Sequence, residues 1–484
     1  MDSSSLVSTA LAISWSALAV GAGWHVLLYK RKPQAALLWL VVIATLPFIG
    51  AVLYASVGVD RIGRRATIKE LRNRAVRGEL EALVAPRDEQ PEEPSDGAAL
   101  PLHLKDFAQL LSNVSRYRAM PGNRLEVLRG GYEFFPRLLG AIESARHSVV
   151  IETFIFDCDS VGRQVLWAMS RASERGVACH LLYDAIGSIN LDLIAVADAQ
   201  SKGVLVTPFA GRNWLRGRFQ INLRNHRKIA VIDGRLGFVG GMNISARHSH
   251  RKGIGLSVID YHFSLSGPAV LQLMAAFAED WFWATGQKLV DSAYYPDLPA
   301  AGDTNCRVLP SGPDGDRGVW QRVLVAAIHN ATATVRIATP YFIPDEAVLT
   351  ALITAAMRGV RVEVVVPRRT DHRYVDWAMK SYFDELLEVG VCLFRRPEPF
   401  LHAKLLLVDD QWASVGSANL DPRSFVLNYE LNLGVVGQEA VASIRSAFEH
   451  ERDASERVTL AEWETRGVTK RAWANFWGLW SPLL

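Results

Sequence analysis

The stretch HRKIAVID at residues 226–233 returns as HAKLLLVD at residues 402–409. Each copy has a histidine, then a lysine two positions later and an aspartate at its end, and a glycine and an asparagine follow both copies at equal distances. The matching positions, which all share the offset between 226 and 402, are His226 and His402, Lys228 and Lys404, Asp233 and Asp409, Gly240 and Gly416, and Asn243 and Asn419. One constant offset over so many positions indicates a duplicated half-site.

The residue types of the two copies suit chemistry at a phosphodiester. A neutral imidazole can attack phosphorus, while a second imidazole protonates the leaving group. The phosphate-binding candidates, which would neutralise and position the nonbridging oxygens, are Lys228, Lys404, Asn243 and Asn419. Because lysines supply that charge, we expect no metal and no other cofactor. A single such motif could arise by chance around a core histidine, but two copies with matching glycine and asparagine make that interpretation improbable.

The pattern around both copies predicts an α/β fold. In each half an amphipathic run leads to an apolar strand, a helix and a second apolar strand, covering 138–184 in the first half and 323–367 in the second. The segments IAVI and LLLV read as strands buried on both faces, with histidine and lysine on one face of the same strand. Glycines at 240, 241 and 416 would let the backbone approach a ligand. We therefore expect two similar halves, 102–300 and 301–484, that form one pseudo-two-fold catalytic body.

The N-terminus predicts membrane attachment. Residues 6–28 and 35–59 contain no Asp, Glu, Lys or Arg, and each run exceeds the roughly 20 residues that a spanning helix needs. We expect a two-helix transmembrane hairpin over 1–60, rather than a signal peptide, followed by a basic helix and an acidic, proline-rich linker over 61–101. That helix would lie on anionic headgroups or simply lead away from the bilayer. More cations follow the second run than separate the two, which favours a cytoplasmic body.

Composition narrows the partners. A net charge of +3 is too small to indicate nucleic acid, and the four scattered cysteines read as reduced packing residues. The segment 211–227, GRNWLRGRFQINLRNHR, interleaves arginines with aromatic residues and suits an anionic headgroup surface, or else is a basic surface loop. Near the C-terminus, Trp473, Phe476, Trp477 and Trp480 follow the spacing of one helix face. That face would lie at a membrane interface or pack on the body.

Longer motifs carry a resemblance to a family. The sequences LLWLVVIATLPFIGAVLYASVG (37–58), TPYFIPD (339–345) and GSANLDPRSFVLNYE (416–430) resemble those of the bacterial cardiolipin synthases in the phospholipase D superfamily. The resemblance implies a phosphatidyltransferase of the bacterial inner membrane, which moves a phosphatidyl group between two phosphatidylglycerol molecules through a phosphohistidine and yields cardiolipin and glycerol. Its partners would be these anionic phospholipids and the bilayer. A phospholipase D or a transferase with another acceptor remains the alternative, since the same intermediate serves both. A nuclease and a noncatalytic scaffold fit less well.

The resemblance also implies roles. His226 would be the nucleophile, and His402 the general acid that later activates the acceptor hydroxyl. Asp260, downstream of the first histidine, and Glu430, downstream of the second, lie where related enzymes place the acid that orients the imidazole. Their alternative is a surface position.

Other motif residues have supporting roles. Although Asp233 and Asp409 belong to the catalytic motif, their odd spacing predicts structural hydrogen bonds across the duplicated site. The halves also differ, and this asymmetry would separate donor from acceptor lipid. The first half has Ser245, Arg247 and His248 where the second has Asp421, Arg423, Ser424 and Asn428.

Overall fold

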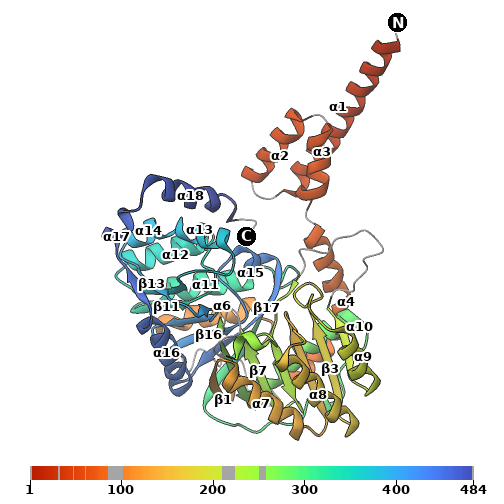
Figure 1. Ribbon diagram of the computed structural model, residues 1–484, viewed down its shortest axis with the longest axis vertical. Coiled ribbons are helices and arrows are strands. Elements are labelled where there is room, and N and C mark those ends of the chain that lie inside the picture. Colours follow the sequence, from red (N-terminus) through yellow and green to blue (C-terminus); the bar gives the residue numbers. More distant parts are fainter. Residues whose placement is uncertain are drawn as a thin grey trace. The chain divides into compact units, whose positions relative to one another are not determined.

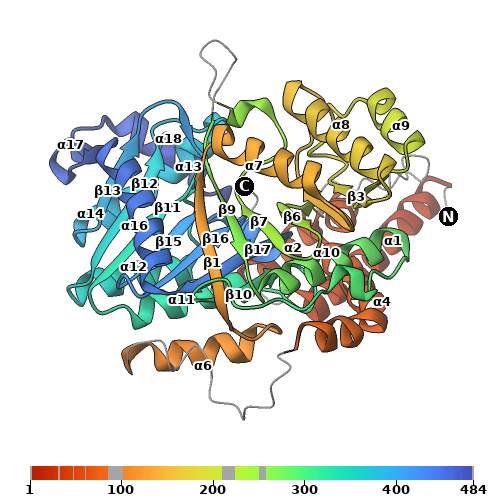
Figure 2. The same ribbon diagram turned by 90° about the horizontal axis from the view of Figure 1, so that it is seen from below.

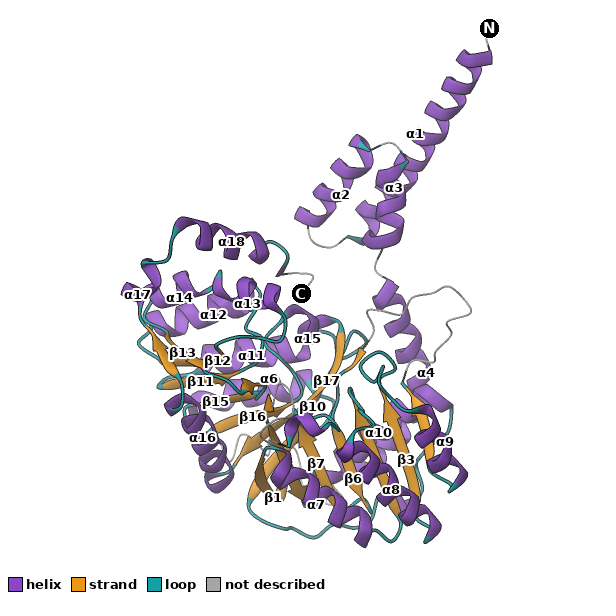
Figure 3. Ribbon diagram, viewed as in Figure 1, coloured by secondary structure: helices purple, strands orange, loops and turns teal. Residues whose placement is uncertain are grey.

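The chain folds into two compact units, Met1–Arg65 and Ala66–Leu484. The computed structural model describes residues 3–30, 33–46, 48–59, 61–85, 102–209, 224–249 and 258–481 (Figure 1). Both predicted catalytic halves lie in the larger unit, which combines helices with a large sheet (Figure 3).

In the N-terminal unit, α1 (Ser3–Tyr29) contains the predicted first span. Its segment Thr9–Tyr29 is long and apolar enough to cross a membrane. The second predicted span is divided into α2 (Pro33–Thr45), α3 (Ile49–Leu53) and η1 (Tyr54–Gly58). The sequence has a proline at position 47, and proline cannot donate a helical hydrogen bond. A continuous second helix was therefore the wrong expectation. The segments pack on one another through Val26, Ile43 and Tyr54.

The strands of the larger unit repeat one order in both halves. The path β9-β7-β6-β2-β3-β4 of the first half matches β17-β16-β15-β11-β12-β13 of the second. β1 pairs with β9 and β10 pairs with β17, while β1 and β10 pair with each other and join the halves. The order confirms the predicted α/β fold in two similar parts.

The first-half strands are β1 (Met120–Arg129), β2 (Ser148–Thr153), β3 (Ala178–Tyr183), β4 (Leu205–Pro208), β5 (Arg224–Asn225), β6 (Ile229–Ile232), β7 (Leu236–Gly240), β8 (Val258–Ile259) and β9 (Tyr261–Ser266). The second-half strands are β10 (Thr304–Ser311), β11 (Thr334–Ala338), β12 (Arg361–Pro367), β13 (Cys392–Arg396), β14 (Phe400–Leu401), β15 (Leu405–Val408), β16 (Trp412–Gly416), β17 (Asn428–Val436) and β18 (Glu456–Val458).

Helices cover both faces of the sheet (Figure 2). On β7, a Cβ at Gly237 would lie 2.8 Å from Leu273 of α10 (Val270–Thr285). The ring of the next residue, Phe238, meets Phe134 of α7 (Gly131–Ser144) with centroids 5.8 Å apart. Successive residues of a strand point to opposite faces, so α10 and α7 lie on opposite sides. Each half thus has its own buried core.

The helices of the first half are α7 (Gly131–Ser144), α8 (Ser160–Glu174), α9 (Leu193–Ser201), η4 (Ala246–His248), α10 (Val270–Thr285) and η5 (Ser292–Tyr294). Those of the second half are α11 (Val319–Asn330), α12 (Glu346–Met357), α13 (Arg373–Lys380), α14 (Phe383–Glu388), α15 (Pro422–Val426), α16 (Gln438–Asp453), α17 (Leu460–Glu464) and α18 (Val468–Gly478). α4 (Arg61–Val84), η2 (Leu102–Leu104) and α6 (Lys105–Val114) precede both halves.

The basic helix α4 packs on the catalytic body. Lys69 is fully buried, with its ammonium 2.8 Å from Asp280 and 3.5 Å from Asp314, and the Asn73 amide donates to the backbone of Glu279. The expectation, that the helix lies on headgroups or leads away from the bilayer, did not include this contact with the body. The larger compact unit extends from Ala66 to Leu484 and so includes most of this helix. Most of the predicted acidic linker, 86–101, lies outside the described residues.

Candidate functional site

The two motif histidines lie just before their buried strands. His226 and Lys228 occupy an irregular stretch between β5 and β6, and His402 and Lys404 one between β14 and β15. The prediction that they lie on the strands themselves was wrong by a residue or more, although IAVI and LLLV do form buried strands. The ammonium group of each lysine donates a hydrogen bond to the backbone carbonyl of the histidine two residues earlier: Lys228 to His226 at 2.7 Å, and Lys404 to His402 at 2.5 Å.

Each histidine is held by the opposite half of the molecule. β5 pairs with β17, and β14 pairs with β8. As a result, the His226 backbone N–H donates to Tyr429 at 2.8 Å, and that of His402 donates to Ile259 at 2.7 Å. Tyr429 precedes Glu430 and Ile259 precedes Asp260, so each histidine lies beside the acid of the other half.

The acids pair crosswise with the histidines. Nδ1 of His226 donates to Glu430 at 2.9 Å, and Nδ1 of His402 donates to Asp260 at 2.7 Å. Both acids are completely buried, which removes the surface-acid alternative. The sequence spacing, however, had counted each acid from the histidine of its own half, and this pairing is corrected. Fixing the proton on Nδ1 leaves Nε2 of both rings as the reactive nitrogen.

Hydroxyl groups support one acid, whereas a glycine makes room for the other. Ser417 and Ser424 donate to Glu430 at 2.6 and 2.8 Å. Position 241 corresponds to position 417, and a Cβ on Gly241 would lie 2.3 Å from the Asp260 carboxylate. The glycine was expected to admit a ligand, but it admits this carboxylate instead. The two half-sites are thus alike in geometry and different in their polar support.

Burial sets the charges in the site. It lowers the pKa of His226 to about 4, against the opposing effect of Glu430, so the imidazole is neutral at physiological pH. Burial lowers the pKa of Lys228 to about 7 and that of Lys404 to about 8. Burial and the adjacent Lys404 ammonium also lower the pKa of His402. Burial would raise the pKa of the Asp260 carboxyl, but Lys404 and His402 outweigh it and hold that pKa at about 2.

The predicted phosphate-binding asparagines occupy equivalent turns. The Asn243 side-chain oxygen accepts from the Ile155 N–H at 3.0 Å. Asn243 also lines a cavity that His402 borders. Its backbone N–H donates to His248 at 3.3 Å, where the corresponding N–H of Asn419 donates to Ser424 at 3.2 Å. Asn419 is buried and does not line that cavity. His248 and Ser424 are therefore the equivalent but different neighbours of the two asparagines.

Asp233 and Asp409 lie away from the histidines and have structural roles. Asp233 accepts from the backbone N–H groups of 146–148, and Asp409 from those of 332–334, at 2.7–3.2 Å. Both have a left-handed φ, 53° and 52°. The structural role agrees with the expectation. The bonds to backbone N–H groups run within each half, whereas Asp409 also contacts His103 of the predicted first half at 3.0 Å. Their place in the motif reflects the turn after the strand.

The basic segment before the first motif is described only from Arg224 onward. Of its predicted headgroup-binding arginines, Arg227 is buried and donates to Asp280 at 2.6 Å, so it does not face a membrane. Residues 210–223 lie outside the described part of the chain.

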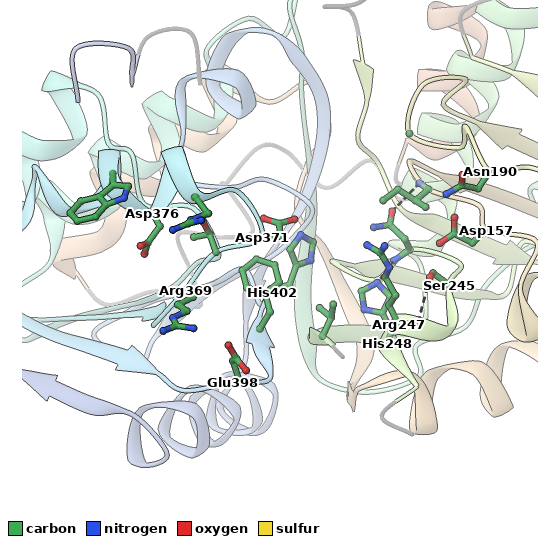
Figure 4. A pocket seen from close by; sticks show the side chains of 18 residues that line it. Asp157, Asn190, Ser245, Arg247, His248, Arg369, Asp371, Asp376, Glu398 and His402 are labelled. Atoms are coloured by element: carbon green, nitrogen blue, oxygen red, sulfur yellow. Dashed lines mark hydrogen bonds between the residues drawn. The ribbon is translucent and has the colours of Figure 1, made fainter. Parts of the chain in front are cut away.

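A cavity of about 800 Å³ opens beside His402 (Figure 4). Figure 4 shows Arg369, Asp371 and Glu398 on the side of His402, and Asp157, Asn190, Ser245 and His248 on the other side. His226, Lys228, Lys404 and Glu430 are not among its lining residues. Sequence reasoning missed Asp157, Asn190, Arg369, Asp371 and Glu398. They follow the carboxyl ends of β2, β3, β12 and β13, the edge of a parallel sheet where ligands bind, and that signal could have found them.

Comparison with known proteins decides the family. A family model described as "Cardiolipin synthase, PLD-like domain" matches residues 138–281 and 324–452, and one described as "Phospholipase_D-nuclease N-terminal" matches 17–58. The chain is 36% identical to cardiolipin synthase A of Pseudomonas fluorescens, with 91% of each chain covered. It is 31% identical to cardiolipin synthase 1 of Bacillus anthracis, with 98% of this chain and 94% of the relative covered. The chain belongs to the cardiolipin synthase family. Its enzymatic class is that of the phosphatidyltransferases, as the motifs implied.

A solved structure shares the fold of this cardiolipin synthase family member. Phosphatidylserine synthase of Haemophilus influenzae superposes with a TM-score of 0.60 at 17% identity, covering 79% of this chain and all of the other. The family and the fold therefore agree with the duplicated architecture built from the sequence.

Proposed function

We propose that the protein makes cardiolipin from two phosphatidylglycerol molecules by double displacement at the paired histidines. The observation that carries the proposal is the crossed pairing, His226 with Glu430 and His402 with Asp260, because it leaves two Nε2 atoms from the two halves for one phosphorus. Family membership supports phospholipids as the substrates.

In the first step, Nε2 of His226 attacks the phosphorus of the donor lipid. A bond from nitrogen to phosphorus forms and the bond from phosphorus to the glycerol oxygen breaks. His402 gives its Nε2 proton to that oxygen, and glycerol leaves. The depressed pKa of His226 keeps its ring neutral, as a nucleophile requires. A bound phosphodiester anion opposes the effect of Lys404 on His402 and helps that ring hold its proton.

In the second step, the terminal hydroxyl of another phosphatidylglycerol gives its proton to Nε2 of His402. The oxygen attacks phosphorus, the phosphorus–nitrogen bond breaks, and His226 is regenerated. Lys228, Lys404, Asn243 and Asn419 would stabilise the negative oxygens in both steps. The two steps use one site, so the halves divide the labour between nucleophile and acid–base catalyst.

Membrane attachment supports this function. The apolar Thr9–Tyr29 segment suits a membrane anchor. We propose that α2, α3 and η1 form a second pass in spite of their break, and that the cations of α4 keep the body in the cytoplasm of the bacterial cell. Labelling of single cysteines placed at the N-terminus and in the body tests this. Both ends on one side of the membrane agree with two passes.

The C-terminal helix gives the body a surface suited to lipid. Trp473 and Phe476 of α18, and Trp480 just after that helix, are 44–49% exposed, while Trp477 packs against Tyr374 with ring centroids 5.9 Å apart. The alternative of packing on the body holds for Trp477, while the exposed aromatic residues leave a membrane-facing role open to proposal. Exposed tryptophans beside Lys470 and Arg471 suit an anionic interface.

The test is to give the purified protein phosphatidylglycerol alone. Cardiolipin together with released glycerol is the expected result. Phosphatidic acid without cardiolipin would reject the proposal in favour of hydrolysis, and a product formed only with another added alcohol would identify a different acceptor. As a control, His226→Ala should form no covalent phosphatidyl enzyme.

A further inference from the structure

The two walls of the cavity beside His402 differ although they come from equivalent strands. The loop after β3 begins with Asp184, whose carboxylate is occupied by the backbone N–H groups of Ile186, Gly187 and Asn225. The loop after β12 has the sequence RRTDHR, 368–373, and is basic. Arg369 of this loop and Arg373, the first residue of α13, are second-half residues that line the cavity.

Arg369 and Arg373 each carry a positive charge that no ion pair neutralises among the described residues, although the cavity also contains carboxylates. Asp371 accepts from the Tyr341 hydroxyl at 2.8 Å, and Asp376 pairs with Lys380 at 2.6 Å. Because these carboxylates already have partners, the arginines are available to an anionic ligand.

The position of the arginines relative to His402 gives that anion a place in the reaction. Under the proposed function, on which this inference rests, His402 serves the leaving glycerol and then the acceptor hydroxyl. The acceptor lipid carries a phosphate at the far end of the same glycerol. That second phosphate must lie beyond His402, away from the phosphorus held by His226. Arg369 lies on the side of His402 (Figure 4), and Arg373 lines the same cavity.

We infer that Arg369 and Arg373 form a subsite for the phosphodiester of the acceptor lipid. In the first step only the donor phosphate is bound, so no phosphodiester occupies the subsite. In the second step the phosphodiester of the acceptor lipid binds there. Glu398, exposed on the same wall and without an ion-pair partner among the described residues, can accept a hydrogen bond from the remaining glycerol hydroxyl. Such a subsite favours a phosphatidylglycerol acceptor over water or a small alcohol.

A glycerol-exchange assay distinguishes binding of the acceptor phosphodiester from the chemical steps at the two histidines. Labelled free glycerol, which has no phosphate, can take the acceptor's place at His402 and return as labelled phosphatidylglycerol. The variant is Arg369→Gln combined with Arg373→Gln. The control is Arg368→Gln, which removes one positive charge from the same loop. The Arg368 side chain pairs with Glu456 at 2.9 Å and does not line the cavity.

The double variant should lose cardiolipin formation by about tenfold or more, since charge-assisted contacts to phosphate are the strong ones, and keep glycerol exchange within about twofold. The Arg368 control should keep both activities. Unchanged cardiolipin formation in the double variant overturns the inference, and so does an equal loss of both activities. A wild-type protein that yields only phosphatidic acid instead rejects the proposed function itself, so the two failures are distinguishable.

Discussion

Replacement of Asp260 by Asn removes the charge behind His402 and keeps the size of the side chain. In the native site, the Asp260 carboxylate lies 2.7 Å from Nδ1 of His402 and is completely buried. An asparagine can still contact the ring, but it cannot stabilise the imidazolium that His402 becomes when it accepts a proton from the acceptor hydroxyl.

The size of the effect follows from the pKa of the carboxyl. Lys404 and His402 hold the pKa of Asp260 at about 2, against an ordinary value of 3.8, in spite of its burial. A difference of this size corresponds to about 2 to 2.5 kcal/mol of net favourable interaction with its charged neighbours, or roughly a 30- to 60-fold change in an equilibrium constant. We therefore expect the Asp260→Asn variant to lose at least about 30-fold in kcat for cardiolipin formation.

The assay follows the covalent intermediate as well as the product. With phosphatidylglycerol as substrate, rapid quenching with a denaturing detergent at neutral pH, which spares the acid-labile phosphorus–nitrogen bond, should detect the phosphatidyl enzyme in the Asp260→Asn variant, because His226 and its partner Glu430 are intact. The Glu430→Gln variant should form that adduct slowly, because its change affects the nucleophile. Each variant should thus resemble a substitution of the histidine in the opposite half.

The reverse pattern would refute the reasoning. If Asp260→Asn abolishes the adduct as His226→Ala does, and Glu430→Gln accumulates it, then either the crossed pairing or the assignment of the two histidines is wrong. Cross-linking or spectroscopic titration of each histidine in the two variants would then decide between them.

Three further predictions follow from other parts of the structure. The kcat/KM should fall as the pH rises through about 7 to 8, because Lys228 and Lys404 then lose the charge that attracts the phosphodiester. The Lys404→Arg variant should stay active at higher pH, and a pH profile identical to that of the wild type would contradict this explanation. Lys69→Met should lower the free energy of unfolding by about 3 kcal/mol in denaturant titrations, because buried Asp280 loses one of its ion-pair partners. The control Lys288→Met breaks an exposed pair with Glu79 and should lower it by under about 1 kcal/mol. Equal losses in the two variants would refute the role of the buried pair. Joint replacement of Trp473 and Trp480 by Ala should reduce activity about tenfold on phosphatidylglycerol vesicles but leave activity on a short-chain soluble analogue unchanged, and a loss on both substrates would indicate a structural role.

Much of the fold was predictable because its signals are local. The strand–helix–strand order of each half follows from apolar runs and turn residues, and β2, β3, β11 and β12 lie within the predicted regions. The break in the second apolar run is also visible locally, as the proline at position 47, but the count of uncharged residues ignored it. Buried Lys69 was unpredictable in isolation, because its partners Asp280 and Asp314 lie in distant parts of the chain.

The candidate site divides in the same way. The duplicated His-Lys-Asp motif needs only one chain offset to be recognised, so the sequence alone determined that two matched half-sites exist, which residues compose them and which family they belong to. Asp260 and Glu430 were recognisable as acids that follow each motif, but a separation along the chain does not say which ring an acid meets.

Only the tertiary structure decided how the halves complete each other. β5 and β14 cross to strands of the opposite half, so each histidine receives its acid from the other half. The two cavity walls likewise come from loops that are distant in sequence and meet only when the sheets join at β1 and β10. The physical reason is that repeats and hydropathy describe neighbours along the chain, whereas proton transfer and lipid selection depend on distances across an interface between the two halves.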